Sequence, residues 1–527
     1  MPHTKKSQKT LSLIITTFAS FFARFAGLIT QVITAWYLTP DDFGIYAIAL
    51  GITTFTLIMR GGGTGLIYQT MRPQEYAAVG GGLIRLALIF AVLGALFTLG
   101  AALPAQNYYD QKSLAWVLVS MAVLAVFNHL SLYPRAKMAS QLLFKEIAWI
   151  DVFTSVVKLA TAFLLARADW GALTFVIAQI CSTFLQIILC SFWARFERQD
   201  FKVQSDWLAP TLAMIKFPFL LSVIFTLTEQ IDTFIASLFV PLASLGVYYF
   251  SFTLAAQPVR LISGTLSSVL APYAARARDN PHLEKLNVTT AFTSSIIFVP
   301  IFVLGIASIY PSLEKIVWGE KWQNSIWPVV FTSLFLVYPT VQTVLEGPLI
   351  GLRRWKLYLT LLSWRALSKV AGVVLAILVI KFYDLRDSSI ALALVVGVGS
   401  LGSISAYIQI RRVLSTFKVD RQMYSFELFA TPLYALLAVI ATEGVVSSLL
   451  NRLDYKADAF RTQALFEFAF TFTLYCSISL VLLRFAYFTK LKVLLALLPQ
   501  NVRKLSCKLL VISERDLALT PSELGNE

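Results

Sequence analysis

The stretch Leu38-Thr39-Pro40-Asp41-Asp42-Phe43-Gly44-Ile45-Tyr46 joins two long apolar segments, and a related stretch follows 202 residues later: Val240-Pro241-Leu242-Ala243-Ser244-Leu245-Gly246-Val247-Tyr248. Each stretch ends one apolar segment and opens the next. The interval holds an even number of apolar segments, so the repeat predicts two halves that share one orientation in a membrane. Such halves are related by an axis along the membrane normal, and their interface is the expected substrate site.

Apolar segments continue in both directions from these stretches. Hydrophobic residues make up 57% of the 527 residues and charged residues only 14%, whereas soluble domains carry about 25% charged residues. Roughly 20 apolar residues are needed to cross a bilayer. We therefore predict an all-α polytopic membrane protein with about fourteen transmembrane spans: 11–38, 45–68, 79–103, 113–133, 147–166, 171–193, 213–239, 245–271, 289–310, 326–351, 359–380, 389–410, 425–450 and 462–486.

The spans suggest four parts. We expect an N-lobe at 1–210, a C-lobe at 211–424, an accessory helix pair at 425–486 and a basic tail at 487–527. Of the 44 Lys and Arg residues, 26 lie in segments on the same side as the N-terminus. Since cytoplasmic loops are enriched in Lys and Arg, both termini are predicted to be cytoplasmic. This distribution also argues against a nucleic-acid partner for the net charge of +15.

Six cations inside the predicted spans suggest what the protein binds. A cation at the bilayer centre costs at least about 2.5 kcal/mol, so each needs an anionic partner, water or a function. Grouped in a water-filled cavity, they would bind an anionic substrate, and guanidinium groups suit phosphate oxygens. Alternatively, the cations pair with acids of the spans. The six cations are Arg24, Arg60, Lys158, Arg260, Arg365 and Lys369, and the acids are Asp151, Glu229, Asp232, Glu346, Glu427, Glu443 and Glu467.

Two of these groups have helical spacing. Arg365 and Lys369 are four residues apart, so they share one helix face and repel each other unless an anion lies between them. Glu229 and Asp232 are three residues apart, and such a carboxylate pair in a membrane can bind Na⁺ or share a proton. We interpret the acid pair as a possible ion-coupling site. The alternative is that these acids pair with the arginines or lie near the outer interface.

Enzymatic chemistry has no support in the sequence. The nucleotide-binding pattern G-x-x-x-x-G-K-[ST] is absent, and the His and Cys residues show no metal-ligand spacing. The predicted loops are too short for a soluble catalytic domain. We therefore expect a transporter with no cofactor or metal, driven by Na⁺, H⁺ or the membrane potential.

Three blocks carry a resemblance to a known family: Phe22–Gly27 with Tyr37–Ala47, Gln230–Ile235 through Leu245–Tyr248 to Leu270–Tyr273, and Trp318–Trp322. In order and spacing, they resemble the polysaccharide transporter family of Wzx-type O-antigen and exopolysaccharide flippases, within the multidrug/oligosaccharidyl-lipid/polysaccharide (MOP) exporter superfamily. The basic cavity residues of the family's first, second and eighth spans fall on Arg24, Arg60 and Arg260.

The resemblance implies a two-lobed flippase in the bacterial inner membrane. It would move an undecaprenyl-pyrophosphate-linked oligosaccharide to the periplasmic leaflet by alternating access. Its partners would be that substrate, membrane lipids and polysaccharide polymerase or chain-length proteins. Two alternatives stay open: a cation-coupled multidrug exporter of the same superfamily, and a membrane-embedded polymerase or ligase of polysaccharide assembly.

Overall fold

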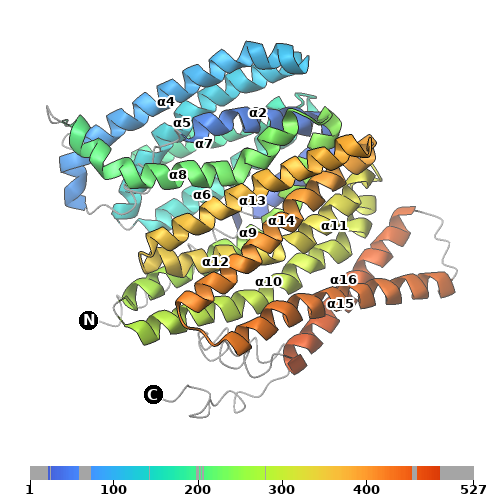
Figure 1. Ribbon diagram of the computed structural model, residues 1–527. Helices are drawn as coiled ribbons and strands as arrows, with labels where there is room; N and C mark the ends of the chain where they lie inside the picture. The colour runs from blue at the N-terminus through green and yellow to red at the C-terminus, as the bar shows by residue number, and fades with distance from the viewer. Residues whose placement is uncertain are drawn as a thin grey trace. The chain divides into compact units, whose positions relative to one another are not determined.

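The computed structural model describes residues 22–23, 25–58, 73–141, 143–196, 201, 203, 207–278, 280–453 and 460–486. Within these ranges every regular element is a helix, which confirms the predicted all-α class (Figure 1). After a first helix at Phe25–Tyr37 come α2 Pro40–Ile58, α4 Pro73–Tyr109, α5 Lys112–Ser140, α6 Phe144–Arg167, α7 Leu173–Trp193, α8 Leu208–Ser237, α9 Leu242–Arg276, α10 Pro281–Trp318, η3 Gln323–Ser325, α11 Ile326–Phe335, α12 Val337–Gly351, α13 Trp355–Phe382, α14 Asp387–Thr416, α15 Arg421–Leu453 and α16 Phe460–Ala486.

A helix covers every predicted span from the third to the fourteenth. The tenth, 326–351, is divided into α11 and α12, and the pair is bent by 44°. Among the described residues, eight helices are long and apolar enough to cross a membrane, or nine if the bent pair is one span. The chain is thus a multi-pass membrane protein, and fourteen crossings remain a prediction.

By internal contacts the chain divides into two compact units. The first comprises residues 1–250 and 362–398, and the second comprises 251–361 and 399–527. Their boundaries fall inside α9, α13 and α14. The lobes predicted from the sequence remain predictions, and the predicted tail at 487–527 lies outside the described residues.

In the first unit, α5 packs against α4 and α7, and α7 packs against α6 (Figure 1). Helix α4 buries Leu83 and Leu86 in a small apolar cluster, whereas Leu96 and Leu103 are exposed. Exposed leucines on a helix of this length are favourable against lipid rather than water. The cluster therefore holds the helices together while the outer apolar face suits a bilayer.

The two repeated stretches, 38–46 and 240–248, contact each other directly. Helices α2 and α9 begin at the same repeat position, Pro40 and Leu242. A Cβ on Gly44 would overlap the Leu242 carbonyl oxygen, and a Cβ on Gly246 would overlap the Pro40 carbonyl oxygen. The contact is reciprocal, and only glycine lets the two backbones approach this closely. The close contact between the two stretches therefore explains why each has a glycine at the same repeat position.

In the second unit, α10 packs against α12, α15 and α16 (Figure 1). The core here includes Phe292, Val341 and Leu428. The Trp318–Trp322 block ends α10: Gly319 has the left-handed conformation, with φ 61°, and Glu314 accepts a hydrogen bond from the Trp322 backbone N–H at 2.9 Å. This block is therefore a helix C-terminus fixed by a buried carboxylate.

Candidate functional site

The predicted site residues are distributed over four helices and the undescribed part of the chain. Arg24 and Arg60 lie outside the described residues. Arg260 is exposed on α9, in the second unit. The remaining predicted residues belong to the first unit: Lys158 is on α6, Glu229 and Asp232 are on α8, and Arg365 and Lys369 are on α13.

Helices α8 and α13 bring the predicted acids and cations together. The Thr228 hydroxyl donates to the Ile224 carbonyl of its own helix and lies 3.4 Å from the Leu362 carbonyl oxygen of α13. Four residues further along α8, the Lys369 ammonium donates to Asp232 Oδ1 at 3.4 Å. The two helices therefore run in the same direction. Because Glu229 precedes Asp232 by three residues and Arg365 precedes Lys369 by four, Glu229 and Arg365 lie at the same level along this contact.

Asp232 has different partners on its two carboxylate oxygens. Oδ1 faces the Lys369 ammonium, whereas Oδ2 accepts a hydrogen bond from the Tyr248 hydroxyl at 2.6 Å. The Asp232 side chain is only 3% exposed and that of Lys369 13%. Thus the predicted coupling acid and a predicted substrate cation form one buried ion pair. Their assigned roles in substrate binding and ion coupling stay predictions.

Tyr248 is the residue of this cluster that sequence reasoning missed. It is the last residue of the second repeated stretch, and its counterpart Tyr46 stacks on Phe175 with ring centroids 4.6 Å apart. The repeat aligned the two tyrosines, but an aromatic residue in an apolar helix gives no sign of a carboxylate partner 16 positions away. The missing signal is the packing of α9 on α8.

Lys158 lies on a polar stripe of α6. Asp151, Thr154 and Thr161 occupy the same face at helical spacing, and Lys158 is half-buried. No carboxylate in the described part of the chain lies within 4 Å of its ammonium. Asp151 is two turns away, about 10 Å along the helix. Lys158 is therefore a partly buried cation available to an anion.

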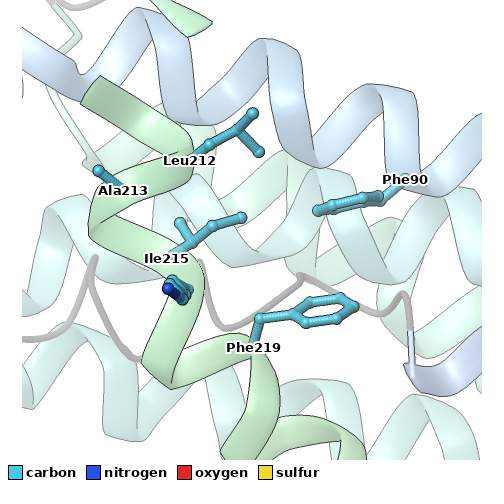
Figure 2. Close-up of a pocket in the computed structure, with 6 residues that line it drawn as sticks. Phe90, Leu212, Ala213, Ile215 and Phe219 are labelled. Carbon is cyan, nitrogen blue, oxygen red and sulfur yellow. The ribbon is translucent and has the colours of Figure 1, made fainter. Parts of the chain in front are cut away.

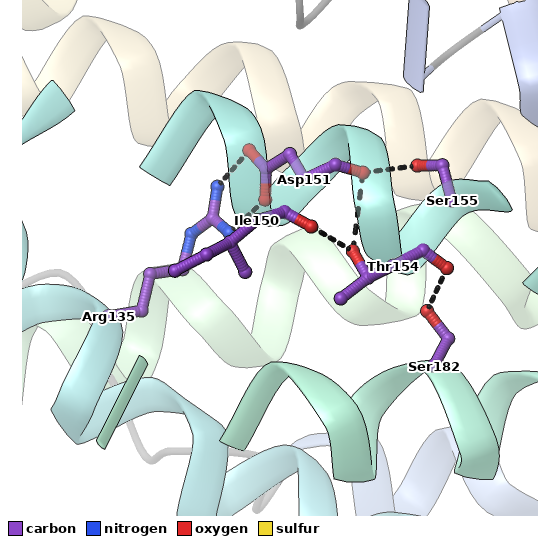
Figure 3. Close-up of polar contacts among 6 residues, drawn as sticks. All are labelled: Arg135, Ile150, Asp151, Thr154, Ser155 and Ser182. Atoms are coloured by element: carbon purple, nitrogen blue, oxygen red, sulfur yellow. Dashed lines mark hydrogen bonds and ion pairs between the residues drawn. The ribbon is translucent and has the colours of Figure 1, made fainter. Parts of the chain in front are cut away.

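A second ion pair joins α5 to α6 (Figure 3). The two terminal nitrogens of the Arg135 guanidinium, Nη1 and Nη2, contact Asp151, and Nη2 lies 2.8 Å from Oδ2. The Arg135 side chain is 39% exposed and that of Asp151 22%. The Thr154 carbonyl accepts from the Ser182 hydroxyl at 3.0 Å, which ties α6 to α7.

Arg135 follows the predicted span 113–133, in a segment predicted to be cytoplasmic. The predicted span ended at 133, but α5 continues through Pro134 to Ser140. The extra turns place Arg135 on α5, opposite Asp151. The alternative that the six cations pair with acids of the spans is met by Lys369 and Asp232. Asp151 pairs instead with Arg135, and the Glu467 carboxylate lies 3.8 Å from Lys315, neither of which is among the six.

An apolar pocket of about 430 Å³ lies between α4 and α8 (Figure 2). It is lined by Phe90, Leu212, Ala213, Ile215, Lys216 and Phe219. The Phe90 and Phe219 rings stack with centroids 6.0 Å apart. With a single charged residue, this pocket suits a hydrocarbon chain rather than a sugar or a pyrophosphate. None of the predicted site residues that the structure describes lines it.

Comparisons with known proteins give one family and one fold. A family model for "Polysaccharide biosynthesis protein" matches residues 33–327. No curated protein matches the chain. The lipid II flippase MurJ in its inward closed conformation is similar over 89% of this chain and 99% of its own, with 15% identity and a TM-score of 0.65.

Two further solved structures share the fold. A MOP superfamily transporter from Pyrococcus furiosus, reported with a binding pocket of reversed polarity, matches 78% of this chain and 96% of its own, with 15% identity and a TM-score of 0.53. A MATE protein in complex with MaD3S matches 77% of this chain and 96% of its own, with 14% identity and a TM-score of 0.54. At such identities the similarity shows the fold of these transporters.

Proposed function

Since this chain belongs to the polysaccharide biosynthesis protein family, we propose that it is a flippase of the MOP superfamily that carries a lipid-linked oligosaccharide. Family membership confirms the resemblance drawn from the three sequence blocks. The structurally similar proteins are transporters, which agrees with the prediction that the chain is not an enzyme. The proposed substrate is an undecaprenyl-pyrophosphate-linked polysaccharide repeat unit, carried across the bacterial inner membrane by alternating access.

The observation that carries this proposal is the environment of Lys158. It is a partly buried ammonium inside a membrane-spanning helix, and no described carboxylate is within ion-pair distance. A cation in such a position needs an anionic partner or water. A substrate pyrophosphate supplies that partner, and Arg24, Arg60 and Arg260 are proposed to bind the same group. The sugars would occupy a hydrated cavity, and the lipid chain would remain in the bilayer.

The energy source is proposed to be Na⁺, H⁺ or the membrane potential, with Glu229 and Asp232 as the coupling acids. Both termini are proposed to be cytoplasmic, which would put Lys145 and Lys216 on the cytoplasmic side of their helices. Polysaccharide polymerase and chain-length proteins are the proposed partners on the other side. The multidrug-exporter alternative would need a pocket suited to cationic drugs. The ammonium of Lys158, which has no carboxylate partner among the described residues, would repel a cationic drug.

An export assay with matched variants tests the proposal. Arg24→Ala, Arg60→Ala and Lys158→Ala are each expected to reduce polysaccharide export by at least about tenfold, because each removes a charge-assisted contact to phosphate. Arg24→Lys, Arg60→Lys and Lys158→Arg should restore export in part. Lys145→Ala is the control, since Lys145 is an exposed cation on the same helix as Lys158.

Membrane insertion of every variant would be checked by fractionation, so that lost export is not lost protein. Full export by all three alanine variants would overturn the assignment of these cations to the substrate. Equal losses in normally inserted Lys145→Ala and Lys158→Ala would show that export depends on the charge of α6 in general rather than on phosphate binding by Lys158.

A further inference from the structure

The two contacts of Asp232 differ in quality. The Tyr248 hydroxyl donates to Oδ2 at 2.6 Å, a short hydrogen bond to a charged acceptor. The Lys369 ammonium is 3.4 Å from Oδ1, beyond the usual length of a charge-assisted bond. The carboxylate is thus held mainly by Tyr248, while Lys369 contacts it at one loose point.

From this difference we propose that Lys369 is a transferable cation. It pairs with Asp232 while the substrate site is empty, and it leaves Asp232 to contact a phosphate when the anionic lipid binds. This inference rests on the proposed function, because it requires an anionic substrate. In this role, Lys369 alternates between two anions, the Asp232 carboxylate and the substrate phosphate. Asp232 is its partner only while the site is empty.

Three features of the cluster permit the transfer. The lysine stem has four rotatable carbons and its ammonium is a point charge, so it changes partners without a fixed geometry. Lys369 is also the more exposed member of the pair, whereas Asp232 is almost fully buried. When Lys369 leaves, the carboxylate keeps its bond from Tyr248 and is not left without a donor.

The charges along the α8–α13 contact make the transfer a competition. Arg365 and Lys369 lie one turn apart on α13, and Glu229 and Asp232 lie about one turn apart on α8, so the four formal charges sum to zero. An incoming phosphate therefore competes with Asp232 for the Lys369 ammonium. Removing the Asp232 charge should release Lys369 from this contact and tighten phosphate binding, which is the opposite of the loss expected from damage to a structural ion pair.

Binding of undecaprenyl pyrophosphate to the purified full chain in detergent tests this competition. Asp232→Asn is expected to tighten binding by about tenfold, within the usual range of coupling between two ligands of one group. Lys369→Gln is expected to weaken it by about tenfold. When Asp232→Asn is added to Lys369→Gln, it should change the affinity for undecaprenyl pyrophosphate by less than about twofold, because the Lys369 ammonium is absent from both proteins compared.

The double variant separates transfer from simple repulsion. If Asp232→Asn tightens binding as much without Lys369 as with it, the acid only repels the phosphate and the inference is overturned. Unchanged or weaker binding by Asp232→Asn in the native background also overturns it. Asp151→Asn is the matched control, since it removes a carboxylate from an ion pair on other helices of the same unit. The affinity of this variant for undecaprenyl pyrophosphate should equal that of the wild type.

Undecaprenol, which lacks the phosphates, distinguishes the two levels of the proposal. If wild-type protein binds undecaprenol and undecaprenyl pyrophosphate with equal affinity, the proposed function itself is contradicted. A preference for the pyrophosphate without tightening by Asp232→Asn would contradict only the transfer. If Asp232→Asn fails to fold, Tyr248→Phe provides the second test: it leaves Asp232 dependent on Lys369, so pyrophosphate affinity should fall by about threefold, and a rise would overturn the inference.

Discussion

Two ion pairs in the described part of the first unit differ in geometry and burial, and in opposite directions. Arg135 and Asp151 make a forked contact through two nitrogens and two oxygens, yet both side chains reach the surface of the protein. Lys369 and Asp232 are much more buried, yet they meet at a single long contact. The better-made pair is the more exposed one.

This difference indicates different roles for the two pairs. Taking charges out of water is costly, and only good geometry with further hydrogen bonds offsets that cost. If an ion pair stabilises the fold, its hydrogen-bond geometry should therefore be best where the pair is most buried. Arg135–Asp151 fits a clamp between α5 and α6, whereas Lys369–Asp232 is poorly made for stability and fits a group that exchanges partners.

The largest expected effect is the loss of the buried cation. Lys369→Met leaves the Asp232 carboxylate buried with Tyr248 alone, so we expect the free energy of unfolding to fall by about 3–5 kcal/mol. The apparent unfolding temperature in detergent, followed by tryptophan fluorescence, measures the change. Lys369→Met combined with Asp232→Asn should recover most of the loss, because no buried charge remains. A double variant as unstable as Lys369→Met would show that the lysine acts by packing rather than by charge.

A smaller effect is expected at the short contact of the same acid. Tyr248→Phe removes a hydrogen bond to a buried charged group, for which we expect a loss of about 1.5–3 kcal/mol. The same unfolding measurement applies, with Tyr249→Phe as the neighbouring control on α9. Equal losses in both variants would mean that aromatic packing on this helix, and not the hydroxyl of Tyr248, supports the fold.

The exposed clamp should tolerate change better. Asp151→Asn leaves Arg135 without its carboxylate, but the guanidinium already reaches the surface, so we expect a loss of only about 1–2 kcal/mol. Higher salt should reduce the difference between Asp151→Asn and wild type, since salt screens exposed charges. If Asp151→Asn proves more destabilising than Lys369→Met, burial is a poor guide to these pairs and the comparison fails.

Much of this fold could be predicted from the sequence because membrane spans depend on local composition. The apolar runs 79–103 and 389–410 lie within α4 and α14. The short repeat that begins at Leu38 and Val240 indicated two helices that start at equivalent positions. Helical spacing also placed Arg365 with Lys369 and Glu229 with Asp232. These signals operate within one segment, where period and length suffice.

The pairing of segments could not be predicted in the same way. Asp232 and Lys369 are 137 residues apart, so their contact depends on how α8 packs against α13. Tyr248 was missed for the same reason. The predicted span 113–133 ends before Arg135, but α5 continues to Ser140, and Arg135 on this helix pairs with Asp151. Sequence alone thus gave cations and acids as candidates, and packing decided which of them meet.

The smallest expected effects come from exchanging the two types of cation. Arg135→Lys replaces a fork by a point charge and should cost about 0.5–1 kcal/mol, the value of one lost hydrogen bond. Lys369→Arg makes the opposite change: a guanidinium can hold Asp232 with two donors, so the apparent unfolding temperature should rise slightly while affinity for undecaprenyl pyrophosphate falls. The unfolding temperature and the affinity must both be measured, because a guanidinium at this position would strengthen the pair with Asp232 and thereby hinder its transfer to phosphate. Tighter pyrophosphate binding by Lys369→Arg would instead mean that the cation is already committed to phosphate and that Asp232 is not its competitor.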